Sequence, residues 1–360
     1  MHDGIVVESA RQLWRSPIPS KPLPRSICEF LLKNHFALGV NMALPSILKD
    51  RLRLPVVASP MFLVSNPELV IAQCTSGIVG SFPSLNARPQ HQLREWLTLI
   101  TEALAKHDAD HPESPSAPFA VNLIVHKSND RIEQDLATIT DFHVPIVITS
   151  LGAREDVNDA VHAYGGIVLH DIINNRFAHK AIEKGADGLI AVSAGAGGHA
   201  GTQSPFGLIQ EIRQWFDGPL LLSGSIAHGR SILAAQAAGA DLAYIGSAFI
   251  ATDEANAPDG YKQMIVDSAA ADIVYSNLFT GVHGNYLRGS IAAAGFDPDN
   301  LGESNPAAMN IRADGSTKAW RDIWGAGHGI GAVQSVGPTA ELIDRLAAEY
   351  AHAREALLSK

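Results

Sequence analysis

The sequence is poor in several features that define protein classes. It has two cysteines in 360 residues, Cys28 and Cys74, with no CxxC spacing and no histidine beside them in the order of a metal site. It has no block of basic residues, and 27 Lys and Arg against 37 Asp and Glu give a net charge of -10. We therefore expect no metal and no nucleic-acid partner. We interpret the cysteines as buried thiols in a reducing compartment.

Long apolar runs are also missing. No window holds eighteen uncharged apolar residues, and the opening MHDGIVVESARQLWRS lacks a basic region followed by an apolar one. We expect no membrane partner and no secretory signal, and therefore a soluble, cytoplasmic protein. Because 46% of the residues are hydrophobic and 18% charged, the chain can bury a large core as one big domain, or as one domain with a smaller one.

The sequence does contain eight short apolar runs, each followed by a turn and a helix-length segment. Continuous apolar runs are typical of strands covered on both faces, as in a parallel sheet with crossover helices. Eight such units predict a (β/α)8 TIM barrel of the α/β class, with a doubly wound sheet as the alternative. The runs are PVVASPM at 55, GIVGSF at 77, FAVNLI at 119, VPIVITS at 144, GGIVLHD at 165, DGLIAVS at 187, GPLLLSGS at 218 and DLAYIGS at 241.

A weak internal repeat supports parallel α/β structure. The segments AIEKGADGLIAVS and AQAAGADLAYIGS both pass through Gly-Ala-Asp into an apolar run. Gly185 and Gly239 stand where a left-handed residue ends a helix, a position that favours glycine. We expect both segments to be the same helix-to-strand junction of one barrel.

The remaining regions lie outside the eight units. We predict an extended N-terminal arm over residues 1–50, because it contains the proline-rich SPIPSKPLPRS. This arm would wrap the barrel or a neighbouring subunit, and a homodimer is one expectation. Residues 256–310 are too long for a plain loop and predict a small helical cap domain inserted after strand eight. The barrel would then comprise 51–255 plus 311–360, with the amphipathic TAELIDRLAAEYAHAREALL closing it.

Glycine-bearing loops follow the last three predicted strands. SAGAGGHAGTQSPF (193–206) follows strand six and holds four glycines around one histidine, while SGS and IGS follow strands seven and eight. Barrel enzymes carry their chemistry on these loops, and those after strands seven and eight commonly bind phosphate through backbone N–H groups. We predict a phosphate site there, with hydroxyl donors from Ser225 and Ser247. The alternative is ordinary Gly-Ser turn chemistry.

Residues 195–200 also fit the loose G-x-G-x-x-A pattern of dinucleotide-binding folds. That pattern opens a helix directly and is followed, about 20 residues on, by an acidic residue at a strand end. Here Pro205 interrupts the path, and strand seven ends in Ser-Gly-Ser. We therefore reject a Rossmann interpretation.

An ordered set of motifs resembles the nitronate monooxygenase family, also called 2-nitropropane dioxygenases. The set is PM after strand one, VNL after three, GGHAGT after six, SGS after seven, IGSAFIAT after eight and a late WGAGHG. The resemblance covers about residues 55–335 and implies an FMN-dependent barrel related to flavin-dependent enoyl-acyl-carrier-protein reductases. It implies His199 as catalytic base, and it implies these cofactor-binding residues: Pro60 and Met61 against the ring, Asn122 bonded to it, Gly197 and Gly198 close to it, and Gly224, Ser225, Gly246 and Ser247 on the phosphate.

The chain departs from the family pattern at two places. Relatives often have a lysine near the end of strand five, where this sequence has His170 and Asp171, so reduced flavin would depend on His170 or on backbone donors. Relatives also tend to read Trp-Ser-Ala-Gly-Gln late in the chain, where this one has Trp324-Gly-Ala-Gly-His328. His328 would contact substrate or fill space.

The resemblance implies oxidation of alkyl nitronates, and of nitroalkanes after proton removal, with O2 to a carbonyl compound and nitrite. The partners would then be a small-molecule nitronate and O2. An alternative uses the same pocket for NAD(P)H-dependent reduction of a quinone or an enoyl thioester. A hypothesis of another class is a non-catalytic flavin-binding protein, against which the presence of His199 argues.

Overall fold

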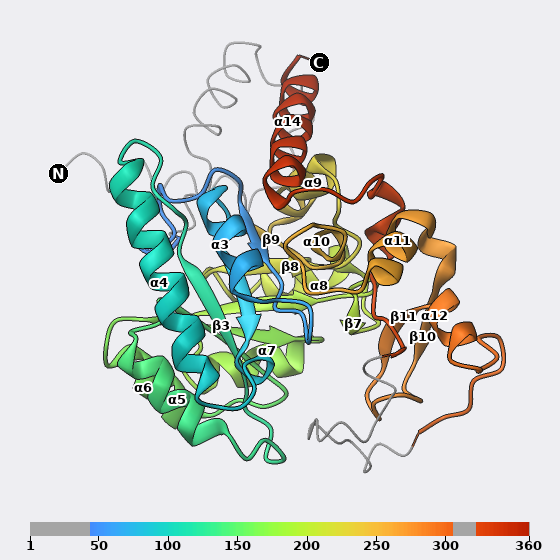
Figure 1. Ribbon diagram of the computed structural model, residues 1–360, viewed down its shortest axis with the longest axis horizontal. Coiled ribbons are helices and arrows are strands. Elements are labelled where there is room, and N and C mark those ends of the chain that lie inside the picture. The colour runs from blue at the N-terminus through green and yellow to red at the C-terminus, as the bar shows by residue number, and fades with distance from the viewer. Residues whose placement is uncertain (1–43, 305–321, 360) are drawn as a thin grey trace, which may run out of the picture. The chain divides into compact units, whose positions relative to one another are not determined.

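Eight parallel strands form the centre of the fold in the computed structural model, which describes residues 44–304 and 322–359 (Figure 1). They run around the sheet in the order β1-β9-β8-β6-β5-β4-β3-β2, and a parallel bridge between Val57 and Val79 joins the two ends. The fold is therefore the predicted barrel, because a doubly wound sheet reverses its strand order and stays open. The strands coincide with the eight predicted runs: β1 (Val56–Ala58), β2 (Gly80–Pro83), β3 (Phe119–Ile124), β4 (Ile146–Ser150), β5 (Ile167–Ile172), β6 (Gly188–Val192), β8 (Leu220–Ser223) and β9 (Leu242–Ile245).

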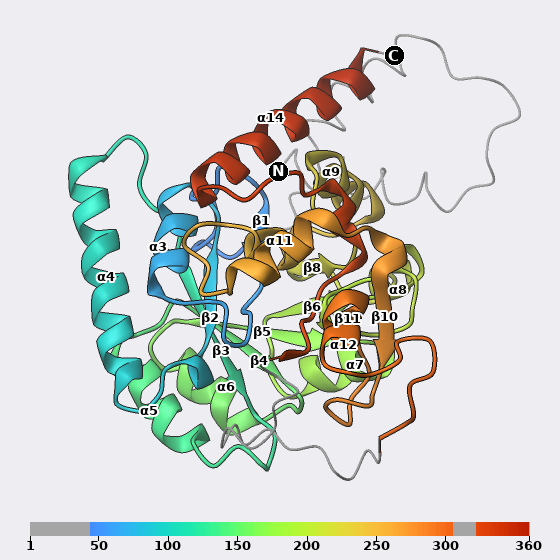
Figure 2. The same ribbon diagram turned by 45° about the vertical axis from the view of Figure 1, so that its right-hand side comes forward.

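Helices lie around these strands in both views (Figure 2). They alternate with the strands along the chain, as crossover connections between parallel strands require. All described residues belong to one compact unit, Met42–Lys360, and within them no helix is long and apolar enough to cross a membrane. The helices of the alternating part are α3 (Pro67–Thr75), α4 (Gln92–Asp110), α5 (Ile132–Asp141), α6 (Glu155–His162), α7 (Asn175–Glu183), α8 (Pro205–Ile212), α9 (Gly229–Ala238) and the short α10 (Ser247–Ile250).

Alternate residues of each strand fill the barrel interior. Val57, Ile148, Leu169 and Leu221 belong to one buried cluster, while their sequence neighbours pack against the helices. Residues 44–52 bring four further apolar side chains onto this inner cluster. The predicted arm up to residue 43 lies outside the described residues. The interior is thus a packed core, and room for chemistry is expected at the C-terminal ends of the strands.

The two Gly-Ala-Asp junctions have the predicted conformation. Gly185 and Gly239 have φ of +90° and +113°, and each follows the last turn of a helix. The aspartates that come next also act alike, since Asp187 accepts from the Val168 amide at 2.7 Å and Asp241 from the Leu220 amide at 2.8 Å. Each junction therefore ends a helix and ties the next strand to its neighbour.

The segment after β9 combines helices with a small antiparallel sheet. It contains the helices expected of the cap, α11 (Asp259–Asp267) and α12 (Arg288–Ala293), and also the strands β10 (Ile273–Ser276) and β11 (Gly284–Leu287). β11 pairs with β10 and with β7 (Gly198–His199), so the segment is hydrogen-bonded to the loop after β6. Residues 305–310 of the predicted cap lie outside the described residues, and its boundaries stay a prediction.

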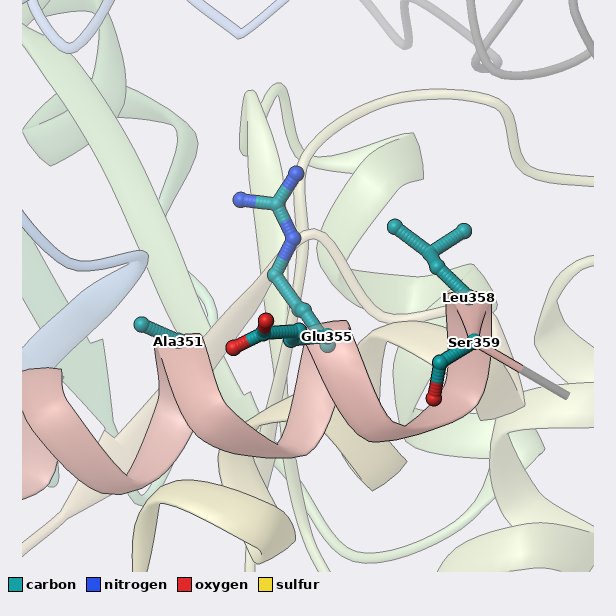
Figure 3. A pocket seen from close by; sticks show the side chains of 5 residues that line it. Ala351, Glu355, Leu358 and Ser359 are labelled. Carbon is teal, nitrogen blue, oxygen red and sulfur yellow. The ribbon is translucent and has the colours of Figure 1, made fainter.

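The last helix, α14 (Thr339–Leu358), is the predicted closing helix and contacts both α3 and α9. It therefore completes the helical layer between the first and last units. The end of α14 forms one side of a surface hollow (Figure 3), which no strand-end loop lines. This hollow is lined by Ala351, Arg354, Glu355, Leu358 and Ser359.

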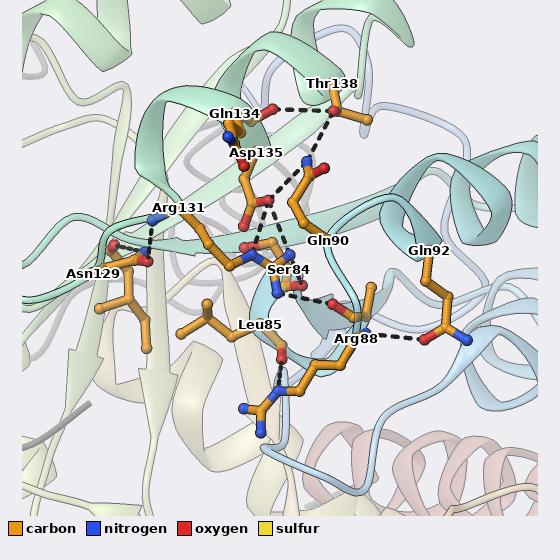
Figure 4. Close-up of polar contacts among 12 residues, drawn as sticks. Ser84, Leu85, Arg88, Gln90, Gln92, Asn129, Arg131, Gln134, Asp135 and Thr138 are labelled. Carbon is orange, nitrogen blue, oxygen red and sulfur yellow. Dashed lines mark hydrogen bonds and ion pairs between the residues drawn. The ribbon is translucent and has the colours of Figure 1, made fainter. Parts of the chain in front are cut away.

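A buried ion pair fixes the loop after β2 to α5 (Figure 4). Arg131 Nη2 lies 2.9 Å from Asp135 Oδ1, and the Asp135 side chain is fully buried. The Arg131 guanidinium also donates to the carbonyl oxygens of Ala87 at 2.9 Å and Ser84 at 3.2 Å. One arginine thus serves a buried carboxylate and two loop carbonyls, which holds this loop in one conformation.

Candidate active site

His199 lies in the short strand β7, in the loop after β6. Gly198 and His199 pair antiparallel with Asn285 and Gly284 of β11, and the Ala200 amide donates to the His283 carbonyl at 3.3 Å. The positive φ of Gly198, +65°, lets the chain turn into this pairing, and a Cβ there would meet no atom within 4 Å. Backbone hydrogen bonds from the inserted segment therefore hold the predicted base in place.

The His199 ring is hydrogen-bonded to the β10–β11 loop and carries no charge near neutral pH. Its Nε2 lies 3.1 Å from Thr280 Oγ1. Burial lowers the pKa of His199 from 6.5 to about 4. A neutral imidazole keeps one nitrogen lone pair, which is what accepting a proton requires.

The glycines around His199 have a packing reason that the sequence did not reveal. A Cβ on Gly195 would stand 2.2 Å from Ser225 Oγ, and one on Gly197 would stand 2.8 Å from both the Gly327 amide and Ser247 Oγ. The Gly195 carbonyl accepts from the amides of Ser225 and His328 at 3.2 and 2.9 Å. Three loops therefore meet through backbone hydrogen bonds at Gly195, and a side chain at Gly197 would collide with the backbone of one of them.

The late WGAGHG motif is one of these three loops. The Ala326 amide donates to the Asn285 carbonyl at 3.2 Å, and the Gly327 amide donates to Ser247 Oγ at 2.8 Å. His328 Nδ1 would lie 2.9 Å from a Cβ on Gly195. The partly buried His328 ring thus packs over the glycine loop, which agrees with the space-filling alternative, and its contact with substrate stays a prediction.

The predicted phosphate residues lie at the ends of the neighbouring strands β8 and β9. Ser225 has φ of +57°, and its amide donates to the Gly195 carbonyl. Of its two donors, only the hydroxyl therefore remains for a ligand. Within the part of the chain that the structure describes, nothing accepts from the amides of Gly224, Gly246, Ser247 and Ala248. Three of these amides are consecutive in the chain, at the end of β9 and the start of the short α10. The amides can serve an anion.

The residues predicted to contact the ring lie at the ends of β1 and β3. The Met61 amide donates to Ser65 Oγ at 3.0 Å, and Met61 Sδ lies 3.7 Å from where a Cβ on Gly246 would stand. Pro60 precedes it and is partly buried. Asn122 Nδ2 donates to the Ile148 carbonyl at 3.0 Å and to Ser150 Oγ at 3.1 Å. A bond from Asn122 to a ligand would therefore use its side-chain oxygen.

The two polar residues of β5 face opposite ways. His170 is buried on the outer face, where its Nδ1 lies 2.6 Å from Thr149 Oγ1, and burial lowers its pKa to about 4. His170 is therefore not placed to support a reduced flavin inside the barrel.

Asp171 shares the inward face of β5 with Leu169, and Tyr244 shares the inward face of β9 with Leu242. Asp171 Oδ1 and the Tyr244 hydroxyl are both buried without a hydrogen-bond partner among the described residues. Burial raises the pKa of Asp171 to about 7 and holds the pKa of Tyr244 well above 10, and the nearby Asp171 charge raises the latter further. Both groups are thus neutral or partly neutral at pH 7.

Sequence reasoning missed the contribution of the β10–β11 hairpin. Thr280 contacts the His199 ring, and Asn285 Nδ2 donates to the Ala196 carbonyl at 2.7 Å. The signal was present in two β-rich runs, DIVYS and HGNYL, separated by a loop that contains glycine. No group of His, Cys, Asp and Glu suited to a metal ion occurs within 44–304 and 322–359.

Comparison with known proteins places this site in a family. The sequence model of nitronate monooxygenases matches residues 46–349. A nitronate monooxygenase of Paraburkholderia phytofirmans is 24% identical over 368 residues, covering 89% of this chain and 97% of that protein. A (3aS,4S,5R,7aS)-5-hydroxy-7a-methyl-1-oxo-octahydro-1H-indene-4-carboxyl-CoA dehydrogenase of Rhodococcus jostii is 26% identical, covering 67% of this chain and 68% of that protein.

A solved structure extends the similarity to the fold. The nitroalkane oxidase of Streptomyces ansochromogenes superimposes with a TM-score of 0.73 at 25% identity, and the match covers 87% of this chain and all of that one. The match of the family model runs from before β1 into α14, so it includes the barrel strands, His199 and the inserted hairpin. The chain belongs to the nitronate monooxygenase family.

Proposed function

We propose that this chain uses bound FMN to oxidise alkyl nitronates with O2 to a carbonyl compound and nitrite, and that it accepts nitroalkanes by first removing their Cα proton. The observation that carries the proposal is the placement of His199. Hydrogen bonds from β11 fix this histidine in the loop after β6, which also contacts the predicted phosphate loops. Family membership supports the same reaction.

The residues at the strand ends fit a flavin phosphate. No described residue accepts from the amides of Gly246, Ser247 and Ala248, so these donors can serve an anion. Pro60 and Met61 would lie against the ring, and the Asn122 side-chain oxygen would accept a hydrogen bond from it. We propose FMN in place of FAD because the sequence has one phosphate motif and no adenylate-binding motif.

The chain's own contribution would be to bind the substrate and move one proton. The electron-accepting chemistry belongs to the flavin when it is bound. A nitronate has already lost its Cα proton, whereas a neutral nitroalkane must transfer it to a base. His199 is neutral at pH 7 because burial holds its pKa at about 4. The nitronate anion formed beside it would favour the protonated ring and raise that pKa during the reaction.

The test compares His199→Ala with the wild type on both substrate forms at one pH, by oxygen uptake. A general base contributes about 10²–10⁴-fold in rate, so turnover of neutral nitroalkane should fall by that order. Oxidation of nitronate, prepared in base and assayed before it reprotonates, should fall much less. His352→Ala, on the exposed face of α14, is the matched control and should change neither rate. Equal fractional losses on both forms would show that His199 only positions substrate or flavin.

The second candidate is a reaction of a thioester or a quinone with NAD(P)H, and the CoA-thioester relative favours it. Anaerobic mixing of the purified protein with propionate 3-nitronate, and separately with NADH, separates the two. Bleaching of the flavin by nitronate alone supports the first proposal, and bleaching by NADH alone supports the second. We also propose a cytoplasmic location and a homodimer, which cell fractionation and sedimentation test.

A further inference from the structure

Thr280 is the hydrogen-bond partner of the His199 ring on the β10–β11 loop. Its Oγ1 lies 3.1 Å from His199 Nε2, and only 9% of the residue is exposed. The same oxygen lies 2.8 Å from the Val282 carbonyl oxygen and 3.2 Å from the Val282 amide nitrogen. Several groups therefore meet at one hydroxyl, which has a single proton to donate.

The acceptors compete for that proton, and the geometry favours Val282. The Thr280–Val282 contact is the shorter of the two, and within the described residues nothing else donates to the Val282 carbonyl. If Thr280 gave its proton to His199, this carbonyl would lose its partner. If Thr280 gives it to Val282, the hydroxyl oxygen accepts from the Val282 amide and from the ring. The His199 contact then requires a proton on Nε2.

We propose that Thr280 is a positioning residue that holds neutral His199 in the tautomer with its proton on Nε2. The nitrogen that accepts the substrate's Cα proton is then Nδ1. The assignment of Nδ1 as the reacting atom rests on the proposed function, whereas the tautomer itself does not.

The backbone supports this arrangement. β7 and β11 pair through His199 and Gly284, so the ring and the β10–β11 loop are fixed relative to each other by main-chain hydrogen bonds. The Tyr286 hydroxyl lies 3.5 Å from Thr280 Oγ1 and adds a contact on the same atom. When Nδ1 takes up a proton, Nε2–H keeps its bond to Thr280, so the imidazolium stays partnered during the transfer.

Nitrogen-15 NMR of protein with labelled histidine reads the tautomer directly, with the His199 signals identified by their loss in His199→Gln. At pH 7 the wild type and Thr280→Ser should show Nε2 protonated and Nδ1 bare. Thr280→Val keeps the shape of the side chain but removes the acceptor, so it should show a mixture of the two tautomers. Protonated Nδ1 in the wild type, or an unchanged Nε2–H form in Thr280→Val, would overturn the proposal.

Kinetics then test the reacting atom. In Thr280→Val only the histidine with its proton on Nε2 is competent, so turnover of neutral nitroalkane should fall to the fraction of that tautomer seen by NMR, a smaller loss than the about 10²–10⁴-fold expected for loss of the base. Thr280→Val should oxidise nitronate at close to the wild-type rate. Thr280→Ser should turn over both substrates at close to the wild-type rates. Equal losses on the two substrates would refute the kinetic part. If His199→Ala also gives equal losses, the proposed base function fails while the NMR assignment of the tautomer stands.

Discussion

Asp171→Asn should stabilise the protein, and the gain should grow with pH. Burial raises the pKa of this carboxyl from 3.8 to about 7, so the folded protein disfavours its charged form. At about 1.4 kcal/mol for each tenfold change in proton affinity, ionising Asp171 lowers the free energy of unfolding by at most about 4 kcal/mol. Between the two pKa values, 3.8 and about 7, the folded state binds more protons than the unfolded chain. The free energy of unfolding therefore falls as pH rises through this range.

The assay is the thermal midpoint of wild type and variant from pH 4 to 9, at equal cofactor content. The difference in thermal midpoint between variant and wild type should be small at pH 4, rise up to about pH 7 and stay constant above it. It should reach a few degrees, because 1 kcal/mol moves the midpoint by roughly 1–2 °C in a chain of this length. Tyr244→Phe is the matched control, because its pKa is held well above 10 and its effect should not change with pH. A difference that is the same at pH 5 and pH 8 would refute the argument.

Two further changes test other parts of the structure. Ser225→Asp and Ser247→Asp should each give folded, colourless protein, because a carboxylate repels the flavin phosphate. Ser204→Asp at the start of α8 should stay yellow. Full FMN content in both site variants would place the phosphate elsewhere, and release of FAD, or of no flavin, from the wild type on acid precipitation would contradict the assignment of FMN. Arg131→Met should lower the free energy of unfolding by about 3–5 kcal/mol, because it leaves the buried Asp135 charge uncompensated. Chemical denaturation measures this, and a change below about 1 kcal/mol would contradict the argument.

The barrel was predictable because its strands are buried on both faces. Each of the eight runs is continuous and apolar, which is typical of parallel strands beneath helices, and glycines such as Gly239 mark the helix ends between them. The hairpin was not predicted, although its strands are rich in β-branched and aromatic residues. Its partner is the two-residue strand at His199, far away in the sequence, and no local periodicity reports such a pairing.

The candidate site was predictable in part for a related reason. A glycine-rich loop after a strand indicates that its backbone lies close to a ligand or to another segment of the chain. From the sequence we predicted that the loop lies close to a flavin ring. The structure shows that Gly195 and Gly197 are close to other loops of the same chain. The contact between these loops was not predicted, because it depends on which loops the barrel brings together, and the approach of Gly197 and Gly198 to a flavin ring stays a prediction.

The opposite directions of His170 and Asp171 show where the information in the sequence ends. In a half-buried strand, alternating polar and apolar residues reveal which side faces the core. β5 has both apolar and ionisable residues on each face, so the same pattern cannot say whether the histidine or the aspartate points into the barrel. The pairing of Thr149 with His170 on the outer face decides it, because it leaves the aspartate on the inner face. The ionisable group inside the barrel from β5 is therefore an acid, and the pH-dependent stability of Asp171→Asn tests this directional assignment as well as the electrostatics.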